Sequence, residues 1–260
     1  MWNADLYNRF EKERMQPSSD LAARIEIKNC RRALDVGCGS GMSTLCLKRR
    51  FPNAEILGAD FSQEMLSKAR ALLPDTQFVL RDCSKPLSDL GKFDIVFSNA
   101  FLQWLENQDE FVAHTKELLN EGGVLAMQIP LFAEMEISKI IERSAQKFSL
   151  ELGEKNLFEG MCVAKNFSAE NYYEIFSKNF SRVEMWQTNY FHQMRSSDEI
   201  VDFVRGTALL PYLERLDEAQ SAEFLRMLKT EIAAHYKPRT NGTVLFPFYR
   251  VFFLAQNSAK

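Results

Sequence analysis

The sequence predicts an α/β protein in which helices cover both faces of a mostly parallel, doubly wound sheet. Short apolar runs alternate with helical patterns between residues 32 and 129, and the connections between them are short. The first run enters a turn that carries Gly37, Gly39 and Gly41 before the next helical pattern begins. Three of the runs end at or beside an aspartate. This combination is typical of a sheet that binds its ligand at the carboxyl ends of the strands.

Apolar spacing predicts the elements of this first half. We expect strands at 32–37, 55–60, 76–81, 93–98 and 123–129, and helices at 42–51, 62–72 and 108–120. Ser62 is a natural N-cap for the second helix. The run Glu121-Gly122-Gly123 is expected to end the third helix and to turn the chain into the fifth strand.

The flanking parts are mainly helical. Residues 4–27 read as helix, with a break predicted between Pro17 and Asp20. The first part of this stretch either docks on the sheet or forms a lid over the ligand site, because both roles need an apolar face. After residue 130 we expect helices at 134–152, 168–178 and most of 197–236, and strands at 182–192 and 244–255.

Composition excludes several function classes. The chain has 260 residues, a net charge of −3 and no long basic run, so nothing indicates a nucleic-acid partner. Its five cysteines have no C-x-x-C spacing, which supports neither a disulfide framework nor a zinc site. No apolar run approaches the ~18 residues that a membrane span needs. We therefore expect a cytoplasmic protein with no metal and no membrane partner, as a monomer or weak dimer.

The glycine turn and the acids together indicate the ligand. Glycines at a strand-to-helix turn let the backbone approach a ligand closely, and the helix N-terminus presents unpaired N–H groups to it. A nicotinamide site follows G-x-G-x-x-G, but Met42 stands at the position of the last glycine. The acids Asp35, Asp60 and Asp82, at three successive strand ends, suit a cationic nucleoside without phosphates. S-adenosylmethionine is such a molecule.

These motifs, with the run Phe93-Asp94-Ile95-Val96-Phe97-Ser98-Asn99, resemble those of class I methyltransferases that use S-adenosylmethionine. The resemblance covers about the first half of the chain. It implies a seven-stranded sheet whose last strand is antiparallel. It also implies that Asp35 and the glycine turn serve the methionine part of the cofactor, Asp60 the ribose hydroxyls, and Asp82 with Cys83 the adenine edge. The implied cofactor-binding set is Asp35, Gly37, Gly39, Gly41, Asp60, Phe61, Met65, Asp82, Cys83 and Asn99.

The second resemblance runs nearly from end to end. Stretches at 6–17, 98–104 and 204–213, with the tail around 249–252, resemble the trans-aconitate methyltransferase family. Such enzymes esterify a carboxylate of a small organic acid. A carboxylate is ionised at neutral pH, so attack on a sulfonium methyl needs no general base, and we expect no catalytic side chain. Holding the reactants in line in a dry site is worth up to ~7–11 kcal/mol.

With this resemblance we expect three parts: N-terminal helices or a lid at 1–29, the cofactor-binding core at 30–130, and the remainder at 131–260 in the same compact domain. A helical substrate cap is expected at 196–240, inserted between the last two strands. The acceptor-binding candidates are Tyr7, Arg14, Trp104, His192, Arg205, Tyr212, Tyr249 and Arg250. Arg14 and Arg205 could equally be surface ion pairs, and His192 a core histidine.

Two departures from the family keep other functions open. Leu210 stands where the family's pattern has an arginine, and residues 132–138 differ from the family's segment. The acceptor could be a different small molecule or a carrier-bound acyl group, as in the malonyl-carrier-protein enzyme of biotin synthesis. A protein that binds S-adenosylmethionine without turnover is an alternative of another class. A nicotinamide oxidoreductase is disfavoured by Met42 and Asp82.

Overall fold

The computed structural model describes residues 10–158 and 167–257, which fall into two compact units. The sheet unit comprises the described residues 12–130, 167–188 and 250–257. The helical unit comprises the described residues 10–11, 131–158 and 189–249. The predicted division at residues 29 and 130, and the placement of a cap over the sheet, stay predictions.

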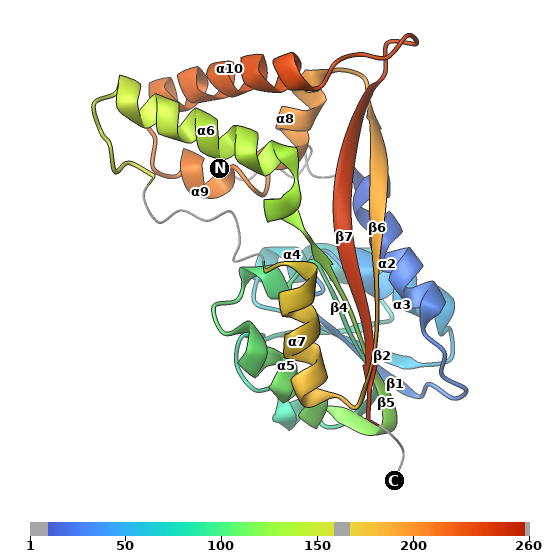
Figure 1. The fold of residues 1–260 in the computed structure, drawn as a ribbon. Helices are drawn as coiled ribbons and strands as arrows, with labels where there is room; N and C mark the ends of the chain where they lie inside the picture. The colour runs from blue at the N-terminus through green and yellow to red at the C-terminus, as the bar shows by residue number, and fades with distance from the viewer. Residues whose placement is uncertain (1–9, 159–166, 258–260) are drawn as a thin grey trace. The chain divides into compact units, whose positions relative to one another are not determined.

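The sheet has seven strands in the order β3-β2-β1-β4-β5-β7-β6 (Figure 1). The strands are β1 (Arg32–Val36), β2 (Glu55–Asp60), β3 (Gln77–Leu80), β4 (Phe93–Asn99), β5 (Leu119–Pro130), β6 (Arg182–Met194) and β7 (Val244–Gln256). Strands β3, β2, β1, β4 and β5 pair in parallel, and β7 is antiparallel to β5. The predicted doubly wound sheet with an antiparallel last strand is confirmed. Its parallel strands all end at one edge, the carboxyl edge.

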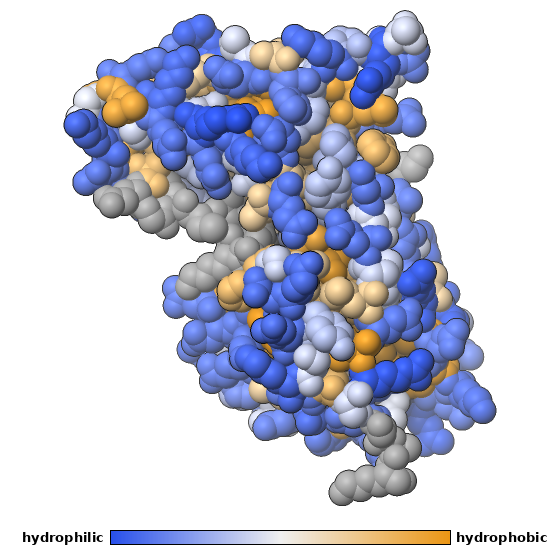
Figure 2. Space-filling view, viewed as in Figure 1, coloured by the Kyte–Doolittle hydropathy of each residue, from blue (hydrophilic) through white to orange (hydrophobic). Residues whose placement is uncertain are grey.

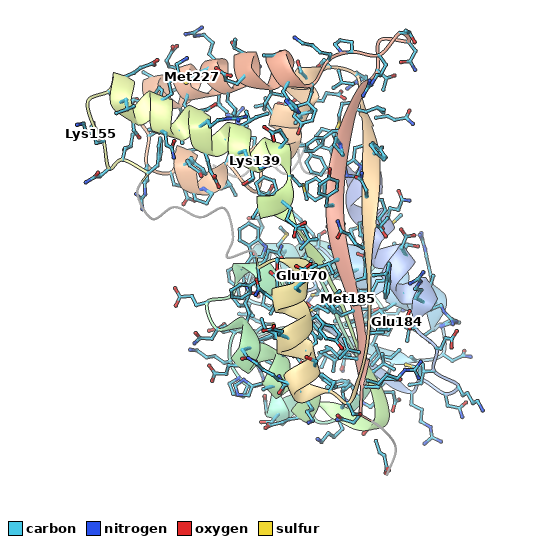
Figure 3. The ribbon with its side chains drawn as sticks, in the orientation of Figure 1. Lys139, Lys155, Glu170, Glu184, Met185 and Met227 are labelled. Carbon is cyan, nitrogen blue, oxygen red and sulfur yellow. The ribbon has the colours of Figure 1, made fainter. Side chains whose placement is uncertain are left out.

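Strand register places two helices of the sheet unit on opposite faces of the sheet. These helices are α2 (Glu11–Arg24), α3 (Met42–Arg50), α4 (Gln63–Leu72), α5 (Gln108–Glu117) and α7 (Ala169–Asn179). Asp35 pairs with Phe97 in register, and its carboxylate binds side chains of α3, so this face carries α3. On the opposite face the ring of Phe176 in α7 stacks on Phe253 of β7, with centroids 4.2 Å apart. The carboxylate of Glu184 on β6, labelled in Figure 3, pairs with Arg24 of α2 at 3.6 Å.

The helical unit buries a core of its own. It contains α6 (Glu136–Glu151), α8 (Ser197–Arg205), α9 (Leu210–Leu213) and α10 (Glu218–His235) with the adjoining ends of β6 and β7. The rings of Phe148 on α6 and Phe224 on α10 lie 5.4 Å apart, and Phe224 also contacts Tyr212 of α9. The outward surface of α6 and α10 is mostly hydrophilic in Figure 2. Helix α6, which follows β5 in the chain, therefore shares a core with the helices between β6 and β7.

Most predicted boundaries agree with the structure, but the prediction fails at two places in the chain. Helix α2 continues through Pro17, so the predicted break there was wrong. Leu21 and Ile25 after the proline are fully buried, and this packing offsets the ~3 kcal/mol that an interior proline costs. Helix α5 ends at Glu117 rather than 120, because Leu119 already pairs with Phe93 of β4. Strand β5 therefore begins at Leu119 rather than 123, and the predicted turn at 121–123 was wrong, since these residues lie inside the strand.

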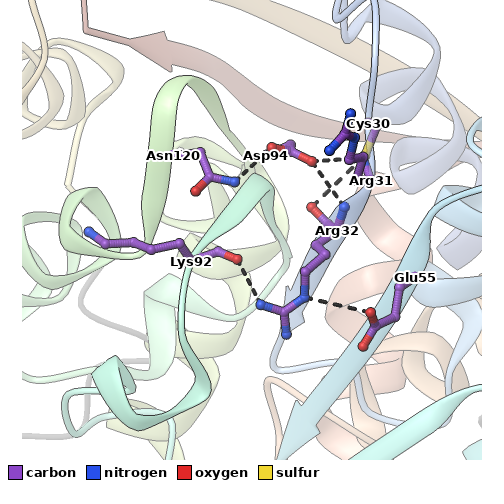
Figure 4. A network of polar contacts seen from close by, with 7 residues as sticks. All are labelled: Cys30, Arg31, Arg32, Glu55, Lys92, Asp94 and Asn120. Carbon is purple, nitrogen blue, oxygen red and sulfur yellow. Dashed lines mark hydrogen bonds and ion pairs between the residues drawn. The ribbon is translucent and has the colours of Figure 1, made fainter.

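Asp94 connects neighbouring strands by hydrogen bonds at the amino edge of the sheet (Figure 4). One carboxylate oxygen accepts hydrogen bonds from the backbone N–H groups of Arg31 (2.7 Å) and Arg32 (3.0 Å), and the other accepts from Nδ2 of Asn120 (2.7 Å). Partial burial alone raises the pKa of Asp94, but these bonds and the charge of Arg31 outweigh it and lower the pKa. Asp94 thus links the start of β1 to β4 and β5.

We expect Asp94→Asn to lower the free energy of unfolding by about 1–2 kcal/mol at pH 7, since it loses charge-assisted hydrogen bonds. The folded-state pKa is lowered, so this contribution is present above the unfolded pKa of ~3.9 and is lost as pH falls through the folded pKa. Urea unfolding at pH 7 and pH 3 tests this, with exposed Asp75→Asn as the control. An equal deficit of Asp94→Asn at both pH values would contradict the assignment.

Candidate functional site

The glycine turn joins β1 to α3 in a left-handed backbone conformation. The φ angles of Gly37, Gly39 and Gly41 are 73°, 52° and 86°, a region that favours residues without a Cβ. The N–H groups of Gly37 and Cys38 both donate to the carbonyl of Ala59, at 2.9 and 3.1 Å. These bonds tie the turn to β2. The turn therefore lies beside the carboxyl ends of β1 and β2, where the sequence predicted it.

Asp60 connects this turn to the next helix. Its Oδ2 accepts a hydrogen bond from the N–H of Gly39, and its Oδ1 accepts from the N–H of Ser62, both at 2.9 Å. Ser62 caps α4 through a bond from the N–H of Met65 to its Oγ, as predicted. An ionised carboxylate has about four lone-pair sites, so two remain for hydroxyl donors of a ligand. Phe61, next in the chain, is 71% exposed.

Asp35 lies fully buried behind the turn. The hydroxyls of Ser43 and Thr44, in the first turn of α3, both donate to its Oδ2 at 2.6 Å. Its Oδ1 is buried and has no hydrogen-bond partner among the described residues. Burial raises the pKa of Asp35 to about 6, although the two hydroxyls lower it. Ser43 and Thr44 were not predicted as site residues; hydroxyls directly after the glycines were the signal for them.

The third acid is in a different environment. Asp82 is exposed, and its Oδ1 accepts from the N–H (3.0 Å) and the hydroxyl (2.6 Å) of Ser84. These bonds lower its pKa, so the group stays ionised at neutral pH. Cys83 is buried, and burial raises the pKa of its thiol to about 12. The thiol is therefore neutral and is available for packing and weak hydrogen bonding rather than as a nucleophile.

A strained residue follows the end of β4. Ala100 has φ of 55°, a conformation that residues with a Cβ rarely adopt. Its N–H donates to the carbonyl of Gln128 on β5 (2.9 Å), and its carbonyl accepts from Nε2 of the buried Gln103 (2.7 Å). Asn99, just before it, has a buried Oδ1 without a partner among the described residues. Backbone strain held in this way is common at functional edges.

The predicted acceptor-binding residues are distributed over both units. Trp104 and Arg250 belong to the sheet unit; Trp104 is 51% exposed. His192, Arg205, Tyr212 and Tyr249 belong to the helical unit. Arg14 lies in α2, and only its backbone is described. Tyr7 lies outside the described residues.

Within the helical unit, two of these candidates are core residues. His192 is buried against the rings of Phe203 and Phe248, at centroid distances of 5.4 and 5.7 Å. Tyr212 is buried against Phe158 and Phe224. Arg205, in contrast, is exposed at the end of α8. A packing role is therefore as well supported for His192 and Tyr212 as a binding role.

A pocket of about 600 Å³ opens elsewhere in the sheet unit, between the start of α5 and α7. An ion pair between Lys178 and Asp109 (3.1 Å) lies in its wall. None of the predicted site residues lines it. Among the described residues no group of three or more His, Cys, Asp or Glu side chains could hold a metal ion. No helix among the described residues is long and apolar enough to cross a membrane.

Residues 34–127 match the family described as Methyltransferase domain. The chain is 35% identical over 260 residues to the trans-aconitate 2-methyltransferase of Methylobacterium radiotolerans, with 99% of each chain covered. It is 36% identical over 255 residues to the enzyme of that name from Escherichia coli, with 98% of each covered. The chain belongs to the trans-aconitate 2-methyltransferase family. The predicted family is confirmed, and the similarity includes both units.

Two solved structures share the fold of this family member. The YcgJ protein of Bacillus subtilis aligns with a TM-score of 0.60 at 14% identity, covering 94% of this chain and 99% of its own. Phosphoethanolamine N-methyltransferase 2 of Haemonchus contortus, solved with S-adenosyl-L-methionine, aligns with a TM-score of 0.55 at 15% identity, covering 94% and 53%. At such low identity these structures support the fold alone.

We expect Gly37→Ala to destabilise this family member far more than Gly122→Ala. The two glycines have φ of 73° and 72°, so both substitutions bear the same left-handed strain of about 1–2 kcal/mol. A Cβ on Gly37 would also lie 2.4 Å from the ring of Phe101, whereas one on Gly122 meets nothing within 4 Å. Thermal unfolding of both variants measures the difference, and equal losses would show that Phe101 gives way freely.

Asp35 predicts a pH dependence of stability. Its pKa is raised from 3.8 to about 6 in the folded state, so between these values the folded protein binds more protons than the unfolded chain. The contribution of Asp35 to the free energy of unfolding is therefore present below about pH 4 and lost as pH rises through about 6. A displacement of about two pH units corresponds to about 3 kcal/mol. We expect Asp35→Asn to remove this slope, and unfolding curves that stay parallel to wild type from pH 4 to 7 would refute it.

Proposed function

We propose that this protein transfers the methyl group of S-adenosyl-L-methionine to a carboxylate of trans-aconitate. The observation that carries the proposal is the similarity to trans-aconitate 2-methyltransferases at 35–36% identity over nearly the whole chain. The glycine turn, Asp35 and Asp60 at the carboxyl edge support it. The exposed Phe61 beside Asp60 adds an apolar surface for an adenine ring.

The residues present fit this cofactor. The turn has no side chain at Gly39, where even an added Cβ would meet nothing within 4 Å, so a ligand can approach its backbone. The turn and the buried acid Asp35 would hold the methionine part, and Asp60 the ribose hydroxyls. Asp82, Cys83, Phe61 and Met65 would surround the adenine. When bound, the cofactor supplies an electrophilic methyl group on a positively charged sulfur.

The chain's own contribution is binding, orientation and exclusion of water. The acceptor carboxylate is already ionised, so no residue has to remove a proton before its oxygen attacks. Two negatively charged carboxylates remain beside the reacting one in a tricarboxylic acid, and cations must offset them. Arg14, Arg205 and Arg250 are proposed for this role, with Tyr7, His192, Tyr212 and Tyr249 as hydrogen-bonding partners and Trp104 beside the transferred methyl. We further propose a cytoplasmic monomer or weak dimer.

The test is incubation of the purified protein with S-adenosyl-L-methionine and a panel of small acids, with mass spectrometry of the products. We expect trans-aconitate to gain one methyl group in a base-labile ester. Asp60→Ala should weaken cofactor binding by tenfold or more in calorimetry, since it loses a charge-assisted contact to hydroxyls. The exposed Asp75→Ala is the control.

The results distinguish the alternatives. Cofactor binding without methylation of any acid would contradict the carboxylate acceptor and direct the search to carrier-bound acyl groups. Absence of cofactor binding by the wild-type protein would contradict the whole proposal. Unchanged affinity in Asp60→Ala would remove this residue from the cofactor site.

A further inference from the structure

Gln128 is a buried polar residue whose side chain has no part in the proposed contacts to cofactor or acceptor. It lies near the carboxyl end of β5 with 0% exposure, and it is followed by Ile129, also at 0%. Its Oε1 accepts a hydrogen bond of 3.0 Å from Nη1 of Arg250 on β7, which is 5% exposed. Its Nε2 is buried and has no hydrogen-bond partner among the described residues. A buried donor without a partner is uncommon in folded proteins and calls for an explanation.

Strand register places Gln128 in a row of polar side chains. Gln128 pairs with Asn99 of β4, and Pro130, two residues further along β5, pairs with Arg250 of β7. Paired residues, and residues two apart on one strand, point to the same face of a sheet. Asn99, Gln128 and Arg250 therefore share one face at the carboxyl edge. It is the face of Asp35, because Asp35 pairs with Phe97 and Phe97 is two residues from Asn99.

The chemistry of Arg250 orients the amide of Gln128. A guanidinium has only donors, so the amide oxygen must face it and the amide NH₂ must face away. The hydrogen bond thus has two effects. It holds one N–H of Arg250 in place, and it presents a second donor, Nε2 of Gln128, beside the guanidinium.

We infer that Gln128 is a further residue of the acceptor site, which positions Arg250 and donates with it to one carboxylate of the substrate acid. A carboxylate is the ligand that fits, because it accepts from a neutral amide and a cation at once. The inference rests on the proposed function, in which Arg250 offsets a substrate charge. It adds the prediction that acids with a carboxylate besides the reacting one are preferred over monocarboxylic acids.

The variant Gln128→Glu separates this role from a structural one. The new carboxylate pairs with Arg250 at least as well as the amide does, so a residue that only holds Arg250 would keep its function. If Gln128 binds the acceptor, the new glutamate would instead repel the acceptor's carboxylate and would lack the Nε2 donor. We expect the KM for trans-aconitate to rise at least thirtyfold, with cofactor affinity unchanged and the melting temperature unchanged or higher. Gln128→Met, of similar shape, should raise KM about tenfold.

The control is Gln77→Glu, the same chemical change at an exposed position on β3, which should leave KM unchanged. Binding of trans-aconitate in calorimetry, with S-adenosylhomocysteine present, repeats the comparison without turnover. An unaltered KM and acid affinity in Gln128→Glu, with an active wild type, would overturn the inference alone. A wild type that neither binds nor methylates any acid would overturn the proposed function, and the inference with it.

Discussion

The carboxylate of Asp60 is the contact on which the geometry of the glycine turn, the proposed cofactor site, depends. One oxygen binds the N–H of Gly39 in the turn, and the other binds the N–H of Ser62 at the start of α4. Its backbone carbonyl also accepts from the N–H of Arg81, just past β3. A single residue at the end of β2 thus orients segments that follow β1, β2 and β3. The same carboxylate that organises the turn has acceptor sites left for the proposed ribose hydroxyls. Their binding therefore needs no second acidic side chain.

The acids of the site differ because their surroundings differ. Asp35 is enclosed behind the turn, where burial makes the ionised form costly, and its pKa is about 6. Asp82 is open to water and bonded by Ser84, so its pKa is lowered. A bound sulfonium and ammonium would favour the ionised form of Asp35, because an opposite charge nearby offsets burial. Under the proposed role of Asp35, cofactor binding and ionisation of this residue would therefore be linked, whereas Asp82 would keep its charge in either state.

The sequence was sufficient for the sheet and for the position of the glycine turn and acids at its carboxyl edge, because these rest on local patterns. Strand ends, the glycine turn and the cap at Ser62 are each specified within a few residues. The prediction failed at two places where distant packing overrode a local signal. Pro17 lies inside α2, and Leu119 pairs with Phe93 instead of continuing the helix. The partition into two units was not visible either, since α6 joins the helices between β6 and β7 only through a shared core. On the acceptor side, single Arg, His and Tyr residues carry no pattern that distinguishes binding from packing.

Gln128 shows why the proposed acceptor residues could not all be found from the sequence. Nothing near it in the chain indicates function, since it lies within the apolar run of a buried strand. Its partner Arg250 is 122 residues away, and only the antiparallel register of β7 on β5 brings the two together. A buried amide–guanidinium pair is weak evidence for stability, because well-packed apolar residues would serve a sheet as well. Its place at the edge shared with Asn99 and the strained Ala100, beside the proposed cofactor residues, is the reason to assign it to recognition of the acceptor.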